Sequence, residues 1–462
     1  MARVQVGAAC NGASVQVSTT RCPVDCSTLD VPLDYTDSAS DKKLTLQLLR
    51  VPAPVQPSKG SVLVNFGGPG FEARNTLVTY ADALTDCFSS PAASALMTAT
   101  YPLKAPGQAD NGMGTLWAEA GAWGQACGKN ETAAEMGGLV GTAFVARDLM
   151  QVVDALGEDG KLRYWGISYG TTLGATVAAM FPDRMDKVIL DAVVNSHRYY
   201  HNSGVDIDQL DSADEAWRLF LSQCIEAGPE KCAIAALGSN AIELETALEI
   251  VRASYRTNPV AVNGTVVDYT LVSNLYYFFA RMTPALAAAT SLLLSIVTRE
   301  NLEAVVNAYA ATMEVFGVYE PHYSIKCGDQ FPRYDNLSAA EPDIEYYMQS
   351  SPLFGDVAVS ISAVCARWPF AAKERYEGDF RVKTASPVLL LQNTWDAATS
   401  LDSAFNMSAG FEGSVVVEQE GFGHGTFAQP SKCSMEWTRA YFVNGTLPDG
   451  NVKCPVDVSL FS

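Results

Sequence analysis

The pentapeptide GISYG at 166–170 constrains the fold more than any other feature of the sequence. It follows LRYW (162–165), which is typical of a buried strand, and precedes TTLGATVAAM (171–180), which is typical of a helix. A Gly-x-Ser-x-Gly motif between a strand and a helix is the signature of a nucleophile elbow. Small residues flank the serine because the turn is so sharp that larger side chains would collide with the strand and the helix. We therefore expect Ser168 Oγ to lie clear of a sheet, at the positive end of the following helix.

Strand and helix patterns alternate on both sides of this motif. Apolar residues recur with helical spacing from Val145 to Leu156, with Thr142 as the expected N-cap and Gly157 as the expected end of the helix. A β-like run covers 44–51. Short apolar runs typical of buried strands are SVLVNF (61–66), LRYW (162–165), KVILD (187–191), PVLLLQ (387–392) and SVVVEQ (414–419). Strands that alternate with helices indicate a parallel sheet with crossover helices.

The pattern changes after His197. Residues 211–312 are mostly helical and rich in Ala and Leu, and strand patterns return only at 387. A helical insertion in an otherwise continuous parallel sheet is expected to cover the carboxyl ends of the strands, where such sheets bind ligands. We therefore predict an α/β fold with a mostly parallel sheet built from 1–196 and 381–462, and an inserted helical cap at 197–380.

The composition argues against several classes of function. The chain has 31 Lys and Arg against 51 Asp and Glu, a net charge of −20 that would repel the phosphate backbone of a nucleic acid. The longest apolar run, 284–297, is too short to cross a bilayer and is expected to form a buried helix. The chain has 4 His and no cysteine spacing typical of a zinc motif, so it offers few ligands for a metal site. We expect a small-molecule or peptide substrate, and no nucleic acid, membrane, metal or cofactor.

Cysteines and glycosylation signals favour an oxidising, secretory compartment. The 11 cysteines could form disulfides with one thiol left over, and Cys224–Cys232 and Cys433–Cys454 are the expected local pairs. Residues 1–12 lack the basic flank and apolar stretch of a signal peptide, so we expect an extracellular protein whose signal has been removed. An intracellular protein with scattered buried thiols is the alternative. Asn-x-Ser/Thr sequons occur at Asn130, Asn263, Asn336, Asn406 and Asn444.

The base that would activate the serine can be chosen among the histidines. A serine hydroxyl is a poor nucleophile until a base takes its proton, and in a fold with this elbow the histidine comes last along the chain. His424 lies in GFGHG (421–425), directly after the last predicted strand. His197 and His201 lie at the start of the cap, where a surface or substrate-lining role is expected, and His322 is expected to be structural. We predict that His424 is the base.

An acid must hold the base in one tautomer, and it is expected between the serine and the histidine along the chain. Asp396 lies one short loop after the predicted strand 387–392, where an orienting acid belongs. Asp402 is the nearby competitor, although its position is typical of the start of a helix. We predict a catalytic triad of Ser168, Asp396 and His424.

The loop NFGGPG (65–70) follows the strand SVLVNF and is the candidate oxyanion hole. Backbone N–H groups must point at the developing negative oxygen, and loss of one such donor costs roughly 10²–10³ in rate. Glycine lets the backbone approach the substrate closely, and proline stiffens the loop. We predict that the N–H groups of Gly68 and of Tyr169, the residue after the nucleophile, form the pair. Without Ser168, the same segment would be interpreted as a plain turn.

Several segments resemble one known family. YWGISYGTTLGATVAAMFPDRMDKVILDAVV, NFGGPG, IKCGDQ (325–330), NTWDAATSLDSA and GFGHG are similar to secreted fungal and actinobacterial α/β-hydrolases of the tripeptidyl-aminopeptidase-like, prolyl-iminopeptidase-related group. The resemblance covers nearly the whole chain, and the segment around Cys433 and Cys454 resembles that group's TAP-like C-terminal domain. It implies an α/β-hydrolase fold with a helical cap, a triad of Ser168, Asp396 and His424, and release of residues or short peptides from free N-termini.

Two features differ from that family. Its oxyanion loop usually continues Gly-Ser-Gly, whereas here Phe71-Glu72-Ala73 follow. Its members also carry a strand that ends in Asp-Pro-Arg-Gly and lies beside the oxyanion strand. No such segment is found here, so either the sheet is rebuilt with part of 92–120 or this piece of the family's sequence has been lost, which would impair folding and activity. Glu72 carries a separate hypothesis, that its carboxylate pairs with the amino group of a substrate; the alternative is a solvated glutamate favoured by a helix dipole.

Three functions remain open at the level of the sequence. The leading hypothesis is a serine hydrolase that acts through an acyl-enzyme, as an exo-acting aminopeptidase on peptides. An esterase, a lactonase or an acyl-transferring, product-releasing enzyme of fungal small-molecule metabolism is the alternative, because the elbow serves amides and esters alike. A catalytically silent binding protein on a hydrolase scaffold is the second alternative.

Overall fold

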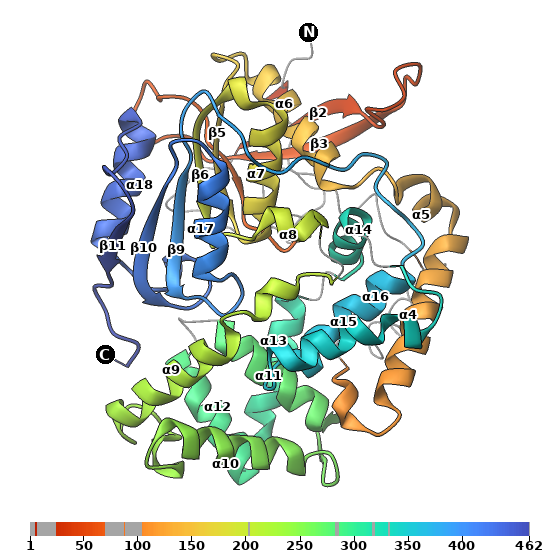
Figure 1. Cartoon of the computed structure of the whole chain (residues 1–462), viewed down its shortest axis with the longest axis vertical. Helices are drawn as coiled ribbons and strands as arrows, with labels where there is room; N and C mark the ends of the chain where they lie inside the picture. The colour runs from red at the N-terminus through yellow and green to blue at the C-terminus, as the bar shows by residue number, and fades with distance from the viewer. Residues whose placement is uncertain are drawn as a thin grey trace.

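A parallel sheet and a group of helices beside it make up most of the chain (Figure 1). They are seen in a computed structural model that describes residues 5–6, 25–69, 87, 104–201, 204–281, 286–316, 319–330 and 333–461. Every helix within these ranges is too short or too polar to span a membrane.

The sheet contains six strands in the order β11-β10-β9-β6-β5-β4, and each neighbouring pair is parallel. Each apolar run that predicted a strand of this sheet is confirmed. Because the strands are parallel, their carboxyl ends meet at one edge of the sheet. The strands are β4 (Leu63–Asn65), β5 (Leu162–Ile167), β6 (Met185–Asp191), β9 (Leu389–Trp395), β10 (Val415–Phe422) and β11 (Val452–Pro455).

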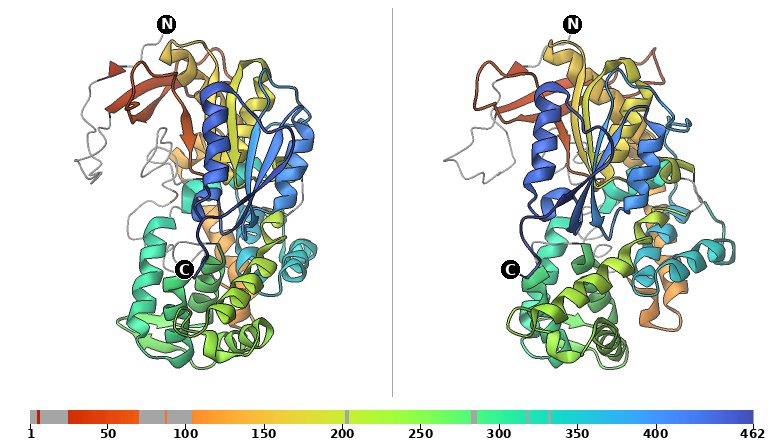
Figure 2. Two further views of the ribbon diagram at one scale, coloured as in Figure 1. Left: turned by 90° about the vertical axis from the view of Figure 1, so that its left-hand side faces the viewer. Right: turned by 60° about the vertical axis from the view of Figure 1, so that its left-hand side comes forward.

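Helices cover both faces of this sheet, and alternate strand residues face opposite layers. In β6, Val188 and Leu190 belong to a buried cluster that includes residues of α6, α7 and α17, whereas Ile189 packs with Tyr441 of α18. Figure 2 shows α17 and α18 on opposite sides of the sheet. Burial on both faces explains why these strands are continuous apolar runs. The helices are α6 (Thr142–Leu156), α7 (Tyr169–Met180), α17 (Leu401–Gly410) and α18 (Lys432–Asn444).

Helix α6 confirms the predicted helix but begins differently. Gly157 ends the helix in the left-handed conformation, with φ of 67°, as expected. The N-cap is Gly141 rather than Thr142, which is the first helical residue. Thr142 N donates to Asp329 Oδ1 at 3.0 Å, and the Thr142 hydroxyl donates to the same carboxylate. A carboxylate from a distant helix therefore satisfies the N-terminal donors that a capping side chain would otherwise serve.

Between β6 and β9 the chain is mainly helical, as predicted. The one hairpin described in this segment, β7 (Val260–Val262) with β8 (Thr265–Val267), turns at Asn263 and Gly264, which both have positive φ. The buried helix expected at 284–297 is α12, which begins at Leu286. The helices are α8 (Ser196–His201), α9 (Ala213–Ala227), α10 (Ala241–Ser254), α11 (Tyr269–Arg281), α12 (Leu286–Thr298), α13 (Leu302–Phe316), α14 (Tyr319–Asp329), α15 (Leu337–Ser350) and α16 (Gly355–Arg367).

Two helices from before the elbow, α4 (Gly112–Lys129) and α5 (Glu131–Met136), also belong with this group. Trp123 of α4 makes edge-on ring contacts with Tyr323 of α14 and with Trp368, and it shares their buried cluster. Figure 1 shows α4 beside α16. The N-terminal part of the chain therefore contributes to the helical group. The division into a core at 1–196 and 381–462 and a cap at 197–380 stays a prediction.

The expected partner of the oxyanion strand is not found among the described residues. There, β4 pairs only with β5. The described part of the segment 92–120 forms the short 3₁₀ helix η1 (Pro106–Gln108) and the start of α4, so it supplies no strand there. A separate antiparallel sheet of β1 (Gln5–Val6), β2 (Asp25–Pro32) and β3 (Lys43–Arg50) confirms the β-like run at 44–51.

Disulfides tie several of these elements together. The predicted local pairs Cys224–Cys232 and Cys433–Cys454 are both present. Cys87–Cys127 and Cys327–Cys365 are two further disulfides, and Cys26 is also disulfide-bonded. Cys327–Cys365 joins α14 to α16, and Cys433–Cys454 joins α18 to the last strand of the parallel sheet.

Candidate active site

The residues predicted to act together follow neighbouring strands at the carboxyl edge of the parallel sheet. Ser168 follows β5, Asp396 follows β9, and His424 follows β10. Gly68 lies in the loop after β4. The strand order β10-β9-β6-β5-β4 therefore brings together segments that are more than 300 residues apart in the chain, from position 68 to position 424.

Ser168 occupies a strained turn between β5 and α7. Its φ of 57° and ψ of −126° are unusual for a residue with a side chain, and such strain is typical of functional sites. A Cβ on Gly166 would lie 2.1 Å from Gly170 O, and a Cβ on Gly170 would lie 2.4 Å from Asn65 O. Both positions therefore exclude any larger residue. The turn is held by Ser168 N, which donates to Asp191 O at 3.0 Å.

Asp396 is fully buried and surrounded by donors. It accepts hydrogen bonds from Ala398 N at 2.8 Å, Thr399 N at 2.9 Å, Thr399 Oγ1 at 2.8 Å and Gly425 N at 3.2 Å. Burial raises the pKa of Asp396, but the His424 ring and the N–H groups of Ala398 and Thr399 lower it further, so the net pKa lies below the ordinary value. The group is thus an anion at neutral pH.

His424 receives this carboxylate on one side of its ring. His424 Nδ1 lies 2.9 Å from Asp396 Oδ2 and 3.0 Å from Oδ1, which fixes Nδ1 as the donor and leaves Nε2 as the basic nitrogen. The His424 side chain is 20% exposed. Among the described residues, the Ser168 hydroxyl makes no hydrogen bond to His424. Such catalytic bonds are often long before a substrate binds.

The loop that carries His424 is braced from β9. Asn393 Nδ2 donates to Gly423 O and to Gly425 O, both at 2.8 Å. Gly423 and Gly425 have φ of 93° and 85°, which favours glycine at both positions. His424 N donates to Arg281 O at 3.0 Å, so the end of α11 supports the loop from the helical group.

Asp191, the last residue of β6, is a site residue that the sequence analysis did not identify. Its Oδ1 accepts from Thr426 N at 2.9 Å, and its Oδ2 accepts from Thr426 Oγ1 at 2.7 Å. Its backbone oxygen binds Ser168 N, so one residue contacts both the elbow and the histidine loop. One sequence signal could have identified Asp191: it ends the apolar run KVILD, which lies between the strand before Ser168 and the strand before Asp396.

The buried Asp191 carboxyl is expected to make stability depend on pH. Burial, aided by the charge of Asp396, raises the pKa of Asp191 to about 6, above the ordinary value near 3.8. The folded state therefore binds the Asp191 proton more tightly than the unfolded state does. This tighter binding stabilises the protein below about pH 4, and the stabilisation is lost as the pH rises from about 4 to about 6. A gap of about two pKa units corresponds to about 3 kcal/mol in the free energy of unfolding. The free energy of unfolding, measured with urea from pH 4 to 7, should therefore decline less with pH in Asp191→Asn than in wild type.

The exposed Asp41→Asn is the matched control, and it should leave the pH profile of stability unchanged. Profiles of wild type and Asp191→Asn that differ by the same amount at every pH would contradict the prediction.

The loop after β4 approaches the elbow closely. Gly67 and Gly68 have φ of 95° and 105°, and Gly67 N donates to Asn65 Oδ1 at 2.9 Å. A Cβ on Gly67 would lie 2.8 Å from Ser168 Cβ and 3.1 Å from Tyr169 N. The predicted oxyanion donors, Gly68 and Tyr169, thus belong to two segments in contact. Glu72 lies outside the described residues.

The other histidines make no hydrogen bond to the triad candidates among the described residues. His322 Nδ1 lies 3.1 Å from Pro69 O, so α14 contacts the predicted oxyanion loop. Burial, aided by the Lys326 charge, lowers the pKa of His322 to about 3, so its ring is neutral. His197 and His201 are in ring contact on α8, and His201 Nε2 lies 3.1 Å from Gly378 O.

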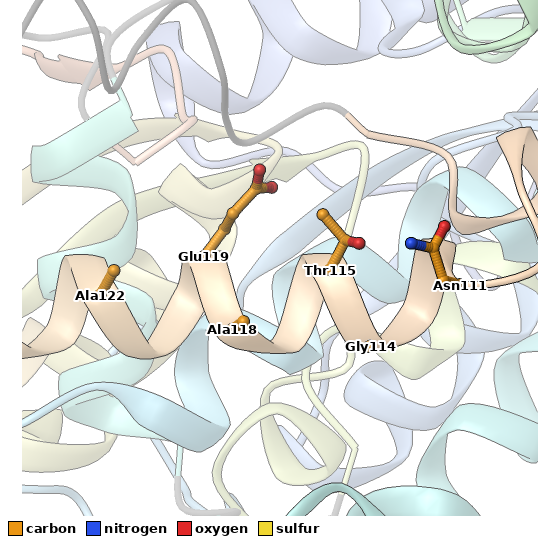
Figure 3. A pocket seen from close by; sticks show the side chains of 6 residues that line it. All are labelled: Asn111, Gly114, Thr115, Ala118, Glu119 and Ala122. Atoms are coloured by element: carbon orange, nitrogen blue, oxygen red, sulfur yellow. The ribbon is translucent and has the colours of Figure 1, made fainter.

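The described residues also include a shallow pocket of about 490 Å³ along α4. Figure 3 shows Thr115 and Glu119 on one side of that helix. None of the triad candidates lines it, so we assign it no part in the chemistry. Within the described ranges, no group of three or more His, Cys, Asp or Glu side chains is placed to hold a metal ion. The pocket is lined by Asn111, Gly114, Thr115, Ala118, Glu119 and Ala122.

Two family models match the chain. A model described as "alpha/beta hydrolase fold" matches residues 90–220, which include the elbow. A model described as "TAP-like protein" matches residues 351–454, which include Asp396 and His424. The two predicted halves of the site therefore fall within two separate matches.

Curated relatives match over most of the chain. A tripeptidyl aminopeptidase from Streptomyces lividans is 27% identical over 470 residues, covering 94% of this chain and 84% of the relative. The serine protease Hip1 of Mycobacterium tuberculosis is 26% identical over 476 residues, covering 93% of this chain and 87% of the relative. A putative hydrolase of Escherichia coli, YuaR, is 26% identical over 220 residues, covering 43% of this chain and 42% of the relative.

Proposed function

Because this chain is a serine hydrolase with the α/β-hydrolase fold and a TAP-like C-terminal segment, we propose that it is a peptidase whose catalytic triad is Ser168, His424 and Asp396. The observation that carries the proposal is the pair of hydrogen-bond distances, 2.9 and 3.0 Å, between His424 Nδ1 and the buried Asp396 carboxylate. This pair lies at the same sheet edge as the strained elbow of Ser168.

In the proposed first step, Ser168 Oγ attacks the carbonyl carbon of a peptide bond. His424 Nε2 takes the hydroxyl proton, and the buried Asp396 stabilises the imidazolium that forms. The carbonyl π electrons move to the oxygen, and the N–H groups of Gly68 and Tyr169 bind the resulting oxyanion. The intermediate collapses when the C–N bond breaks and His424 gives its proton to the leaving amine. An acyl-enzyme on Ser168 remains.

In the second step, water replaces the amine. His424 takes a proton from the water, whose oxygen attacks the acyl carbon to give a second tetrahedral intermediate. Its collapse breaks the bond to Ser168 Oγ, which recovers a proton from His424, and the acid product leaves. Buried Asp191 keeps the histidine loop attached to the nucleophile strand through both steps.

We propose further that the enzyme acts at free N-termini, as an exo-acting aminopeptidase. The support is the set of relatives, among which a 27% identical protein is a tripeptidyl aminopeptidase. The four disulfides between described cysteines support an extracellular location, because such bonds persist in oxidising compartments.

The test compares matched fluorogenic substrates. Tripeptidyl-coumarins with a free N-terminus should be cleaved, and the same peptides with an acetylated N-terminus should be cleaved at least tenfold more slowly. A fluorophosphonate probe should label the protein. Equal rates on free and acetylated peptides would overturn the exo-acting assignment. Faster turnover of p-nitrophenyl esters with no cleavage of any peptide would favour the esterase alternative.

A further inference from the structure

A partly buried arginine beside the histidine loop has no acidic partner among the described residues. Arg281 is the last residue of α11, and its backbone oxygen accepts from His424 N at 3.0 Å. Arg281 Nη2 donates to Gln209 Oε1 at 3.1 Å and to the Tyr277 hydroxyl. Its guanidinium carbon lies 3.7 Å from the centre of the Tyr277 ring. These neutral groups hold the guanidinium in place without neutralising its charge.

Part of the hydrogen-bonding capacity of Arg281 is unused. Its Nε is buried and has no hydrogen-bond partner, and no hydrogen bond of its Nη1 is found among the described residues. Another partly buried arginine, Arg333, instead donates to the backbone oxygens of Gln330, Cys327 and Phe370. Because buried charges are normally paired, an open guanidinium indicates a partner that arrives from outside.

The charges of Arg281 and Asp206 both act on His322, but Asp206 is engaged with another cation. Asp206 forms a buried ion pair with Lys326 and also accepts from Gln330. Among the described residues, the Arg281 charge is therefore left without an acidic partner, in a chain whose net charge is −20.

Arg281 is connected to two loops of the proposed site. Its backbone holds the His424 loop, and its charge acts on His322, whose ring contacts Pro69 of the proposed oxyanion loop. Arg281 therefore lies beside the loop that carries the proposed base.

We propose that Arg281 binds a carboxylate of the substrate, an inference that rests on the proposed peptidase function. A planar guanidinium with open N–H groups matches a carboxylate by charge and by geometry. Two carboxylates are available in a short peptide: the side chain of an acidic residue on the acyl side, and the C-terminal carboxylate on the leaving side. No bond is made or broken in this step.

The experiment uses two pairs of short peptides, with cleavage followed by chromatography. One pair differs only by Glu or Gln on the acyl side, and the other only by a free or amidated C-terminus. Wild type should show at least a tenfold higher kcat/KM for the carboxylate member of one pair, and the responding pair identifies the carboxylate. Arg281→Gln should reduce that ratio to about 1, while Arg281→Lys should keep part of it.

Arg381→Gln is the matched control, because it removes the same charge at a side chain that is 83% exposed. It should keep the wild-type ratio, and thermal unfolding should verify that each variant is folded. Ratios near 1 for wild type in both pairs, or a ratio that Arg281→Gln leaves unchanged, would overturn the inference. If the fluorophosphonate probe failed to label wild type, the result would instead count against the proposed function itself.

Discussion

Replacing Ser168 with alanine should lower kcat for peptide cleavage by about 10⁶, to the level left by binding and the oxyanion hole alone. The reason is chemical, because alanine has no oxygen to attack the carbonyl and no acyl-enzyme can form. Labelling by a fluorophosphonate probe should disappear together with turnover. The variant should remain folded, since the hydrogen bond from the backbone N–H of residue 168 to Asp191 O needs no side chain. Discontinuous assays at known protein concentration would measure the residual rate, and thermal unfolding would verify that the variant is folded.

Ser196→Ala provides the control for this prediction. Ser196 is a buried serine on α8 whose hydroxyl has no hydrogen-bond partner among the described residues. Its replacement should keep both labelling and turnover. If Ser168→Ala retained more than a hundredth of the wild-type kcat, then Ser168 would not be the nucleophile.

Replacing Asp396 with asparagine should lower kcat by about 10⁴. An amide cannot stabilise the imidazolium, and its nitrogen would favour the wrong tautomer of His424. The protein should also lose about 1–3 kcal/mol in its free energy of unfolding, because an amide nitrogen in place of Oδ2 would leave Thr399 Oγ1 and Gly425 N without their acceptor. The rate loss should fall on kcat more than on KM, since Asp396 acts on the chemistry through His424. Steady-state kinetics and urea unfolding of the same preparation separate the two effects.

Asp402→Asn tests the competing acid. Asp402 is exposed in the first turn of α17, whose N-cap is Ser400. We expect its replacement to change kcat by less than about twofold, as for most exposed side chains away from a site. A large loss in Asp402→Asn with little loss in Asp396→Asn would transfer the role of the acid to Asp402.

The strands, the elbow and the relation between Asp396 and His424 could be predicted because each rests on a local pattern. A buried parallel strand needs a continuous apolar run, and the turn around Ser168 needs Gly166 and Gly170. Chain order then selected the acid and the base, and the structure places Asp396 and His424 in hydrogen-bonding contact. The fold was therefore predictable from its own short-range requirements.

Features that depend on long-range packing could not be predicted in this way. Thr142 was expected to cap α6, but the Asp329 carboxylate of α14 takes that role. The sequence around Thr142 gives no sign of this contact. Asp191 appears in the sequence only as the polar end of an apolar run, while its role depends on Thr426, which is 235 residues away. Arg281 likewise gains significance only when α11 reaches the His424 loop.

The attachments of α14 have a consequence for how a substrate gains access. Asp329 binds both Thr142 and Tyr199, His322 contacts Pro69, and Cys327 is joined to Cys365. Movement of α14 away from its neighbours would therefore break buried hydrogen bonds. We therefore expect the proposed peptidase to cleave short peptides faster than intact folded proteins, because its substrate must reach Ser168 without displacement of α14.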